Sequence, residues 1–276
     1  MKNGQVEHIR IKKIGTGGIT EANDRVAVEE PLEIQLAYST ATGRLQKNIA
    51  VTMRTPGNDE ELAAGFLFTE GIINNKESIQ EIKHLSFDEN RILVTLSENI
   101  HPDLANVSRN FYSTSSCGIC GKASIEAIRN VSNYGQEKDT IAINAFVLHD
   151  LQDSLKKQQV VFQNTGGIHA SALFSLEGVF IRLREDVGRH NALDKVIGAA
   201  LIGGELPLSN CILVLSGRTS FELVQKAVMG GIKLIAAVGA PSSLAVELSK
   251  EAGITLAGFL RDSSFNIYSG HQRVIL

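Results

Sequence analysis

The first 55 residues have the hydrophobic pattern of β-strands. Four segments mix alternating and continuous runs of β-type residues, with a Gly15-Thr16-Gly17-Gly18 turn after the first of them. These segments are 6–14, 24–30, 32–38 and 48–53. Next, Asn58-Asp59-Glu60-Glu61 predicts the start of a helix, with Asn58 or Asp59 as its cap and Gly71 at its end. Two further strands are expected at 81–87 and 91–96.

From residue 122 onward the pattern alternates between helical and strand-like segments. Helices are predicted at 122–135, 144–162, 191–204, 220–231 and 242–253. Strands are predicted at 168–175, 179–185, 211–217, 233–239, 254–260 and 265–269. Short apolar strands that alternate with helices indicate an α/β fold of three layers with an at least partly parallel sheet. We therefore expect a β-rich N-terminal part at 1–110 and an α/β domain at 111–276.

The composition favours a folded protein and limits the partners and the location that we expect for it. Of 276 residues 43% are hydrophobic and 21% charged, which is enough to build a core, and the net charge is −3. That charge argues against general nucleic-acid binding. No apolar run reaches the roughly 18 residues of a membrane span, and the N-terminus lacks the apolar segment of a signal peptide. We expect a cytoplasmic location and no membrane partner.

The stretch Ser-Ser-Cys-Gly-Ile-Cys-Gly-Lys at 115–122 holds two of the three cysteines, Cys117 and Cys120. A following helix N-terminus, Lys122 and the flanking glycines would all stabilise a thiolate. A zinc site would need two more ligands, and neither upstream histidine candidate, at 84 or 101, is part of the H-x-E of zinc deaminases. The other hypotheses are a thioredoxin-like dithiol, an inert pair, and a sulfur carrier whose persulfide the second thiol assists or resolves. Cys211 reads as a small apolar residue on its strand.

Polar residues gather where strands end and helices begin. Gly166 precedes one strand, His169 lies at the start of that strand, and Asp186, Arg189 and His190 follow the next strand. Ser216, Arg218 and Thr219 occupy another strand-to-helix turn, and 239–243 repeats that arrangement. Such turns are where open α/β sheets bind ligands, and helix N-termini suit phosphate. The alternatives are a half-buried histidine, a charged turn with internal ion pairs, and simple helix capping; Asp194 and Lys195 could pair locally.

Several long motifs resemble the formate dehydrogenase accessory sulfurtransferase family, FdhD. They lie in the expected order at 55–73, 115–126, 165–174, 184–198, 216–227, 239–249 and 258–269. The resemblance implies a cytidine-deaminase-like α/β core. It also implies that sulfur passes from a cysteine desulfurase to the molybdenum cofactor, as bis(molybdopterin guanine dinucleotide), before insertion into formate dehydrogenase. Cys117 would carry the persulfide, the role of Cys120 is more open, and no catalytic zinc is expected.

By the same resemblance the segment 259–264 contacts the guanine dinucleotide. It consists of Phe259, Leu260, Arg261, Asp262, Ser263 and Ser264. Asp262 can accept hydrogen bonds from guanine, Arg261 can meet phosphate, and Phe259 offers a stacking face; the alternative is a plain hairpin turn. The expected partners are a cysteine desulfurase, the formate dehydrogenase catalytic subunit, a guanine-nucleotide ligand and a second copy in a homodimer. The rival functions are a cofactor-binding chaperone that carries no sulfur, and a zinc deaminase-like enzyme.

Overall fold

The computed structural model describes residues 4–85, 88–102, 104, 134 and 141–276. Cys117, Cys120, the predicted helix at 122–135 and the predicted boundary at 110–111 lie outside the described residues. The predictions that concern them therefore remain predictions.

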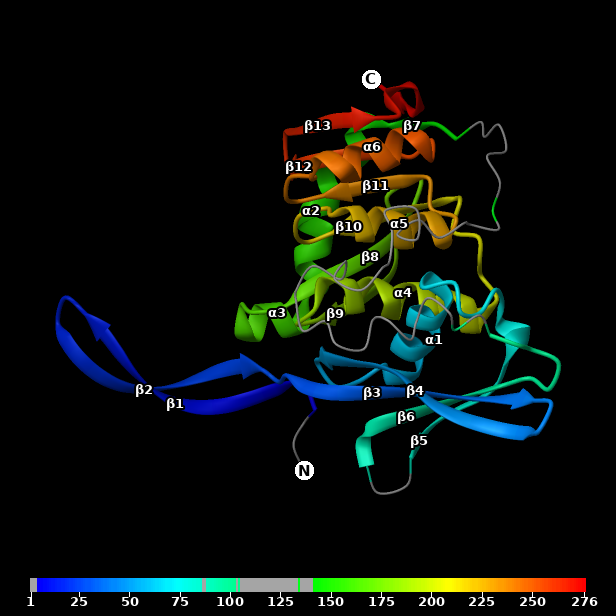
Figure 1. Cartoon of the computed structure of the whole chain (residues 1–276). Coiled ribbons are helices and arrows are strands. Elements are labelled where there is room, and N and C mark those ends of the chain that lie inside the picture. Colours follow the sequence, from blue (N-terminus) through cyan, green and yellow to red (C-terminus); the bar gives the residue numbers. More distant parts are fainter. Residues whose placement is uncertain (1–3, 86–87, 103, 105–133, 135–140) are drawn as a thin grey trace.

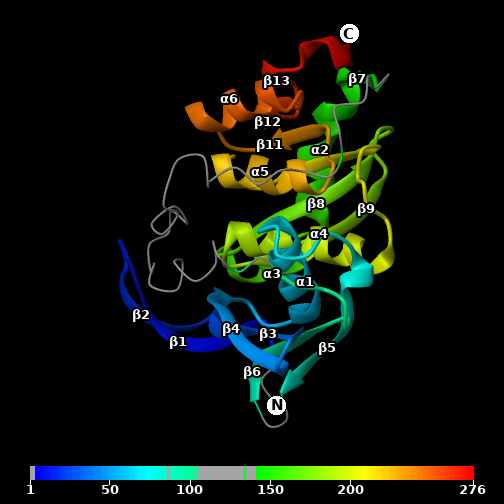
Figure 2. The ribbon, with the colours of Figure 1, turned by 45° about the vertical axis from the view of Figure 1, so that its right-hand side comes forward.

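The N-terminal part consists of a ribbon and a four-stranded sheet. The ribbon pairs β1 (Val6–Gly15) with β2 (Gly18–Ala27), and it extends away from the body of the protein (Figures 1 and 2). The sheet contains β3 (Glu30–Thr40), β4 (Gly43–Arg54), β5 (Ile79–Leu85) and β6 (Asp88–Leu96) in the order β4-β3-β6-β5. The predicted strands are confirmed over the residues that the structure describes, except that 24–30 is divided between the end of β2 and the start of β3; residues 86–87 of the predicted strand 81–87 are not described.

The predicted helix after residue 58 is α1 (Asp59–Thr69). Asn58 occupies the N-cap position in the left-handed region, φ 58°, but its side chain makes no capping hydrogen bond. Asp59 instead forms a bidentate pair with the buried Arg54, at 3.1 Å to Nε and 2.9 Å to Nη2. The polar start of α1 thus ties the helix to the end of β4. A short 3-10 turn, η1 (Lys76–Ser78), leads into β5.

The C-terminal part contains a six-stranded sheet in the order β13-β12-β11-β10-β8-β9. Its strands are β8 (His169–Ser175), β9 (Phe180–Asp186), β10 (Cys211–Leu215), β11 (Leu234–Ala237), β12 (Thr255–Arg261) and β13 (Ser264–Ser269). The helices are α2 (Ala145–Gln158), α3 (Val160–Thr165), α4 (Arg189–Gly203), α5 (Phe221–Met229) and α6 (Ser243–Glu251). A small parallel pair joins β7 (Ile143–Asn144) to β14 (Val274–Ile275), which follows the 3-10 turn η3 (His271–Arg273).

Helices cover both faces of the six-stranded sheet, which confirms the three-layer α/β prediction. Alternate residues of its strands pack with α2 on one face and with α4, α5 and α6 on the other. Strands β10, β11 and β12 are parallel, whereas β8 is antiparallel to β10. The closer likeness to a cytidine deaminase core remains a prediction. Among the described residues, no helix has the length and apolar character needed to cross a membrane.

The predicted helix at 144–162 is divided in two at Gln159. The side chain of Asn144 accepts a hydrogen bond from the amide of Phe146 and caps α2. Beyond Gln159, the buried carboxylate of Glu185 accepts hydrogen bonds from the amides of Val161 and Phe162, both at 2.8 Å. Glu185 thus starts a second helix, α3, whose end at Gly166 leads into the strand β8.

One continuous apolar core joins the two parts of the protein, because α1 packs closely against α4. The helices cross at Gly65 and Gly198, where a side chain on either glycine would collide with the backbone of the other helix. Lys226 of α5 lies beside this crossing, 3.0 Å from Asp194 Oδ2 and 2.9 Å from Thr69 Oγ1. The prediction of local ion pairs is confirmed for Lys195, which binds Asp186 at 2.7 Å, whereas the partner of Asp194 is the distant Lys226.

Candidate functional site

The predicted binding residues meet at one edge of the six-stranded sheet. Strands β9, β10, β11 and β12 run in one direction and β8 and β13 run in the other. Four strand ends and two strand starts therefore share this edge. We call the residues there the strand-end rim: 166–169, 186–191, 216–220, 239–243 and 259–264. The prediction that successive strand-to-helix turns lie together is confirmed.

Hydrogen bonds join neighbouring turns of the strand-end rim into a continuous structure. Ala170 donates to Ser216 Oγ at 2.8 Å, and Thr219 donates to the carbonyl of Ala240 at 3.1 Å. The amide of Phe259 in turn donates to the carbonyl of Gly239 at 3.2 Å. Gly239 also fits tightly, since a Cβ there would lie 2.8 Å from the amide nitrogen of Arg218. The rim is thus fixed by backbone contacts, and its side chains are placed by a rigid frame.

His169 begins β8 and lies half-buried against the turn after β10. A Cβ on Gly217 would come within 3.3 Å of its Nδ1, so the glycine makes room for the ring. Burial lowers the pKa of His169, electrostatic repulsion from Arg189 and His190 lowers it further, and Asp186 opposes these effects. His169 is therefore an uncharged imidazole near neutral pH, able to accept a proton or a hydrogen bond.

His190, in the first turn of α4, faces the first turn of α5. Its Nε2 lies 3.0 Å from Glu222 Oε2 and 3.5 Å from Ser220 Oγ. Sequence reasoning did not select Glu222. The available signal was an acidic residue two positions after a serine at a helix start, which is also a common capping pattern. The structure brings Glu222 to the strand-end rim through the packing of α4 beside α5.

Asp186 lies at the end of β9 beneath the rim and is completely buried. Its carboxylate is 2.7 Å from Lys195 Nζ and accepts hydrogen bonds from Gly188 N, Asn191 Nδ2 and Thr55 N. Burial raises the pKa of Asp186, and Lys195 opposes that change. Both oxygens are used by protein groups, so direct contact with a ligand would require displacing them. In this structure Asp186 holds the 186–191 turn against the end of β4.

The segment 259–264 is the end of β12 and the β12–β13 hairpin, as the hairpin alternative predicts. Phe259 adopts φ 53° and leaves 43% of its surface exposed, whereas Leu260 is fully buried. Arg261 donates through Nη1 to the carbonyl of Val238 at 3.0 Å. Asp262, Ser263 and Ser264 are exposed at the turn. An aromatic face, a cation and a carboxylate are therefore all presented from this one hairpin.

The strand-end rim holds polar atoms whose hydrogen-bonding capacity the described part of the protein leaves unused. Thr219 Oγ1, Arg189 Nε and Glu222 Oε1 are buried without a hydrogen-bond partner among the described residues. Ser220, at the N-cap of α5, makes no capping hydrogen bond with its side chain. Buried polar groups without partners are costly, so they favour a polar ligand that supplies them. The N-termini of α4 and α5 suit an anionic group, whereas Glu222 Oε1, as an acceptor, suits a hydrogen-bond donor of the ligand.

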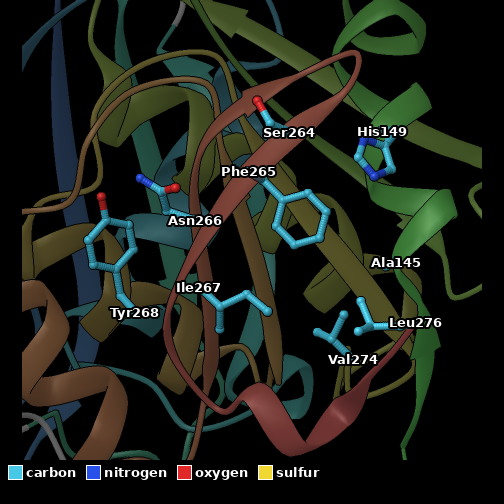
Figure 3. Close-up of a pocket in the computed structure, with 9 residues that line it drawn as sticks. All are labelled: Ala145, His149, Ser264, Phe265, Asn266, Ile267, Tyr268, Val274 and Leu276. Atoms are coloured by element: carbon cyan, nitrogen blue, oxygen red, sulfur yellow. The ribbon is translucent and has the colours of Figure 1, made fainter.

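A cavity of about 690 Å³ adjoins the hairpin end of the rim. It is lined by Ala145, His149, Ser264, Phe265, Asn266, Ile267, Tyr268, Val274 and Leu276. Figure 3 shows Phe265 turned toward His149, and their ring centres are 5.4 Å apart. His149 Nδ1 is buried and has no partner among the described residues. No local sequence pattern points to this cavity, because its wall joins α2 to β13, which are more than a hundred residues apart.

Fold and site together define an α/β protein with a polar rim, a candidate ligand site, at the strand ends of its sheet. Residues 27–275 match the model of the FdhD/NarQ family. The chain is 47% identical over 272 residues to the sulfur carrier protein FdhD of Mycolicibacterium paratuberculosis, covering 96% of this chain and 97% of that protein. It is 40% identical over 272 residues to the same-named protein of Sulfolobus acidocaldarius, covering 99% and 100%.

A solved structure described as a formate dehydrogenase accessory protein, from Desulfotalea psychrophila, matches with a TM-score of 0.71 and 25% identity. The match covers 98% of this chain and 100% of that one. The chain belongs to the FdhD/NarQ family.

Proposed function

We propose that this protein is a sulfurtransferase that carries sulfur to the molybdenum cofactor of formate dehydrogenase. The observation that carries the proposal is the strand-end rim, which gathers cations, helix N-termini and unpartnered polar atoms at one edge. Relatives named as sulfur carriers, similar over nearly the whole chain, support the sulfur chemistry. The molybdenum cofactor is the substrate here and not a resident group.

The rim supplies what a bis(molybdopterin guanine dinucleotide) needs for binding. Its pyrophosphates would lie at the N-termini of α4 and α5, near Arg218 and the buried hydroxyl of Thr219. On the β12–β13 hairpin, the exposed carboxylate of Asp262 would accept hydrogen bonds from guanine, and Phe259 would offer a stacking face. His169 stays uncharged beside this site and can take up a proton during sulfur transfer.

The sulfur chemistry is assigned to the cysteine pair on chemical grounds. A cysteine desulfurase passes sulfane sulfur to the thiolate of Cys117, which becomes the persulfide Cys117–S–SH. Delivery as sulfide requires two electrons. Once the cofactor is bound, Cys120 supplies them when its thiolate attacks the inner sulfur of the persulfide, because the two cysteines then form a disulfide and hydrogen sulfide leaves. The disulfide must be reduced by a thiol before the next cycle.

The test is the intact mass of the protein after incubation with a cysteine desulfurase and free cysteine. Wild type is expected to gain one reducible sulfur atom, and Cys117→Ser is expected to lose that gain. Cys120→Ser should keep the persulfide, and Cys211→Ser is the matched control that leaves the pair intact. If wild type gains no sulfur under conditions that load a known acceptor, the protein acts instead as a chaperone that only binds the cofactor.

The same proposal includes the expected surroundings. The donor is a cysteine desulfurase, the client is the formate dehydrogenase catalytic subunit, and the protein works in the cytoplasm as a homodimer. The name of the solved relative, a formate dehydrogenase accessory protein, supports the choice of client. A fluorescent guanine nucleotide that binds wild type but not Asp262→Asn would support the position of the guanine site.

A further inference from the structure

The β1–β2 ribbon is a prominent feature that neither the strand-end rim nor the family match explains. It projects from the body of the protein in both views (Figures 1 and 2), and the region matched by the family model begins only at residue 27. Its base is closed by a hydrogen bond from Val28 N to Gln5 O. Near that base Arg25 Nη1 donates to Asn164 Oδ1 of α3 at 2.5 Å. The ribbon is therefore anchored at its base, whereas residues 14–19 at its far end are exposed.

The pairing register divides the ribbon into two different faces. Residues paired as Val26 with Glu7 and Ala22 with Ile11 share one face, on which Ile11, Ala22 and Val26 are half-buried. The other face, which we call the open face, is exposed along its whole length beyond the base. It consists of His8, Arg10, Lys12 and Ile14 of β1 and Ile19, Glu21, Asn23 and Arg25 of β2.

The open face is basic with an apolar end. It carries three permanent cations and one carboxylate, although the chain as a whole has a net charge of −3. Within the described part of the protein, Arg10 and Lys12 have no ion-pair or hydrogen-bond partner. At the free end Ile14 pairs directly with Ile19, and these side chains are 79% and 67% exposed. An exposed apolar pair beside unpaired charges is the usual composition of a docking surface, an anchor with a polar surround.

We propose that the open face docks onto an acidic surface of the client formate dehydrogenase, with Ile14 and Ile19 seated in an apolar depression. This inference rests on the proposed function for the identity of the client. The positive charge of the open face favours an acidic partner surface, and the exposed isoleucine pair favours a protein as that partner. The net charge of −3 of the chain, and the carboxylate of Glu21 on the same face, argue against nucleic acid. The projection of the ribbon lets it hold a large partner while the strand-end rim stays accessible.

The experiment measures binding of the full-length protein to purified formate dehydrogenase catalytic subunit lacking its cofactor, at increasing salt concentrations. The variant Arg10→Gln/Lys12→Gln should associate about tenfold more slowly at low salt, with a weaker salt dependence, because charges at the edge of an interface mainly steer association. The variant Ile14→Ser/Ile19→Ser should dissociate about tenfold faster or more, because buried apolar anchors control the lifetime of a complex.

Matched controls keep the reasoning specific to the ribbon. Lys156→Gln/Lys157→Gln removes two exposed charges from α2, and Val51→Ser removes a side chain that is 66% exposed on β4. Both controls should bind within twofold of wild type. Each variant is also loaded by the desulfurase and weighed, since retained persulfide formation shows that the protein is folded and that the sulfur chemistry is intact.

The outcomes separate this inference from the proposed function. Ribbon variants that load sulfur normally but bind the dehydrogenase poorly support the inference. Ribbon variants that bind it as wild type does, or a wild type that does not bind it, overturn the inference and leave the sulfur chemistry standing. Two other results also overturn the inference. One is that the ribbon variants lose binding to the desulfurase but not to the dehydrogenase. The other is that wild type binds duplex DNA more tightly than the dehydrogenase. Ribbon-dependent docking without any persulfide would instead remove the proposed function.

Discussion

The crossing of α1 and α4 yields a prediction whose magnitude follows from the structure. In Gly198→Ala the new Cβ would overlap the carbonyl oxygen of Glu61 and lie 2.7 Å from the amide nitrogen of Gly65. Ordinary contacts begin near 3.4 Å, and both obstacles are helix backbone, so the helices must separate by well over half an ångström. That separation would loosen the core that joins the four-stranded sheet to the six-stranded sheet.

Two opposing effects set the size of the change. Alanine is a better helix former than glycine by about 1 kcal/mol. Overpacking of a tight core costs about 1–3 kcal/mol and more when backbone must move, and we place this site at or above the upper end. The expected result is a loss of about 2 kcal/mol or more, seen as a melting temperature lower by about 4–8 °C.

The assay is thermal unfolding followed by circular dichroism, with Gly203→Ala as the matched control. Gly203 is the last residue of the same helix, is exposed, and has only the flexible side chain of Glu205 near its missing Cβ. The control should be neutral or slightly stabilising. If Gly198→Ala melts at the wild-type temperature or above, the close packing of the two helices is not what joins the two parts.

Three further predictions concern buried or titrating side chains. Lys226→Met would leave Asp194 buried without its countercharge and should cost about 3–5 kcal/mol in urea unfolding, with partial recovery in Lys226→Met/Asp194→Asn; a loss below about 1 kcal/mol would contradict a structural ion pair. The lowered pKa of His169 means that the unfolded chain binds a proton first, so stability should fall as the pH drops below 6.5, and this slope should be smaller in His169→Asn. The measurement is the difference in urea midpoint between pH 7.5 and pH 5.5, and an equal difference for wild type and His169→Asn would refute this prediction. Burial raises the pKa of the Cys211 thiol, which lowers its reactivity. The variant Cys117→Ser/Cys120→Ser, in which Cys211 is the remaining cysteine, should therefore react with iodoacetamide more slowly than a cysteine peptide. An equal rate would contradict this prediction.

Local patterns were sufficient for most elements of the fold. Apolar patterns identified every strand of the six-stranded sheet, because the inner strands place alternate residues in the two cores that cover its faces. The division at Gln159 was missed, because the sequence there has neither glycine nor proline. It arises from Glu185, a residue 24 positions after Val161, which caps the second helix from the end of β9.

The strand-end rim was also predictable in part from local patterns. Strand-to-helix turns with serine, glycine and arginine can be read from sequence, and parallel strands must bring such turns to one edge. The contacts that each side chain of the rim makes could not be predicted from the sequence. Asp186 looked like a ligand group, yet Lys195 and the amide of Thr55 occupy its carboxylate, and Thr55 is 131 residues away.

The sequence by itself determined the α/β class, the order of the elements and the turns that form the rim, and it predicts the cysteine pair as the place for sulfur chemistry. Those properties depend on neighbours within about ten residues. The tertiary structure alone decided the glycine crossing of α1 and α4, the pairing of His190 with Glu222 and the open basic face of the β1–β2 ribbon. Each of these depends on which distant segments are brought within contact distance, and hydrophobic packing is not directional enough for a local pattern to specify that.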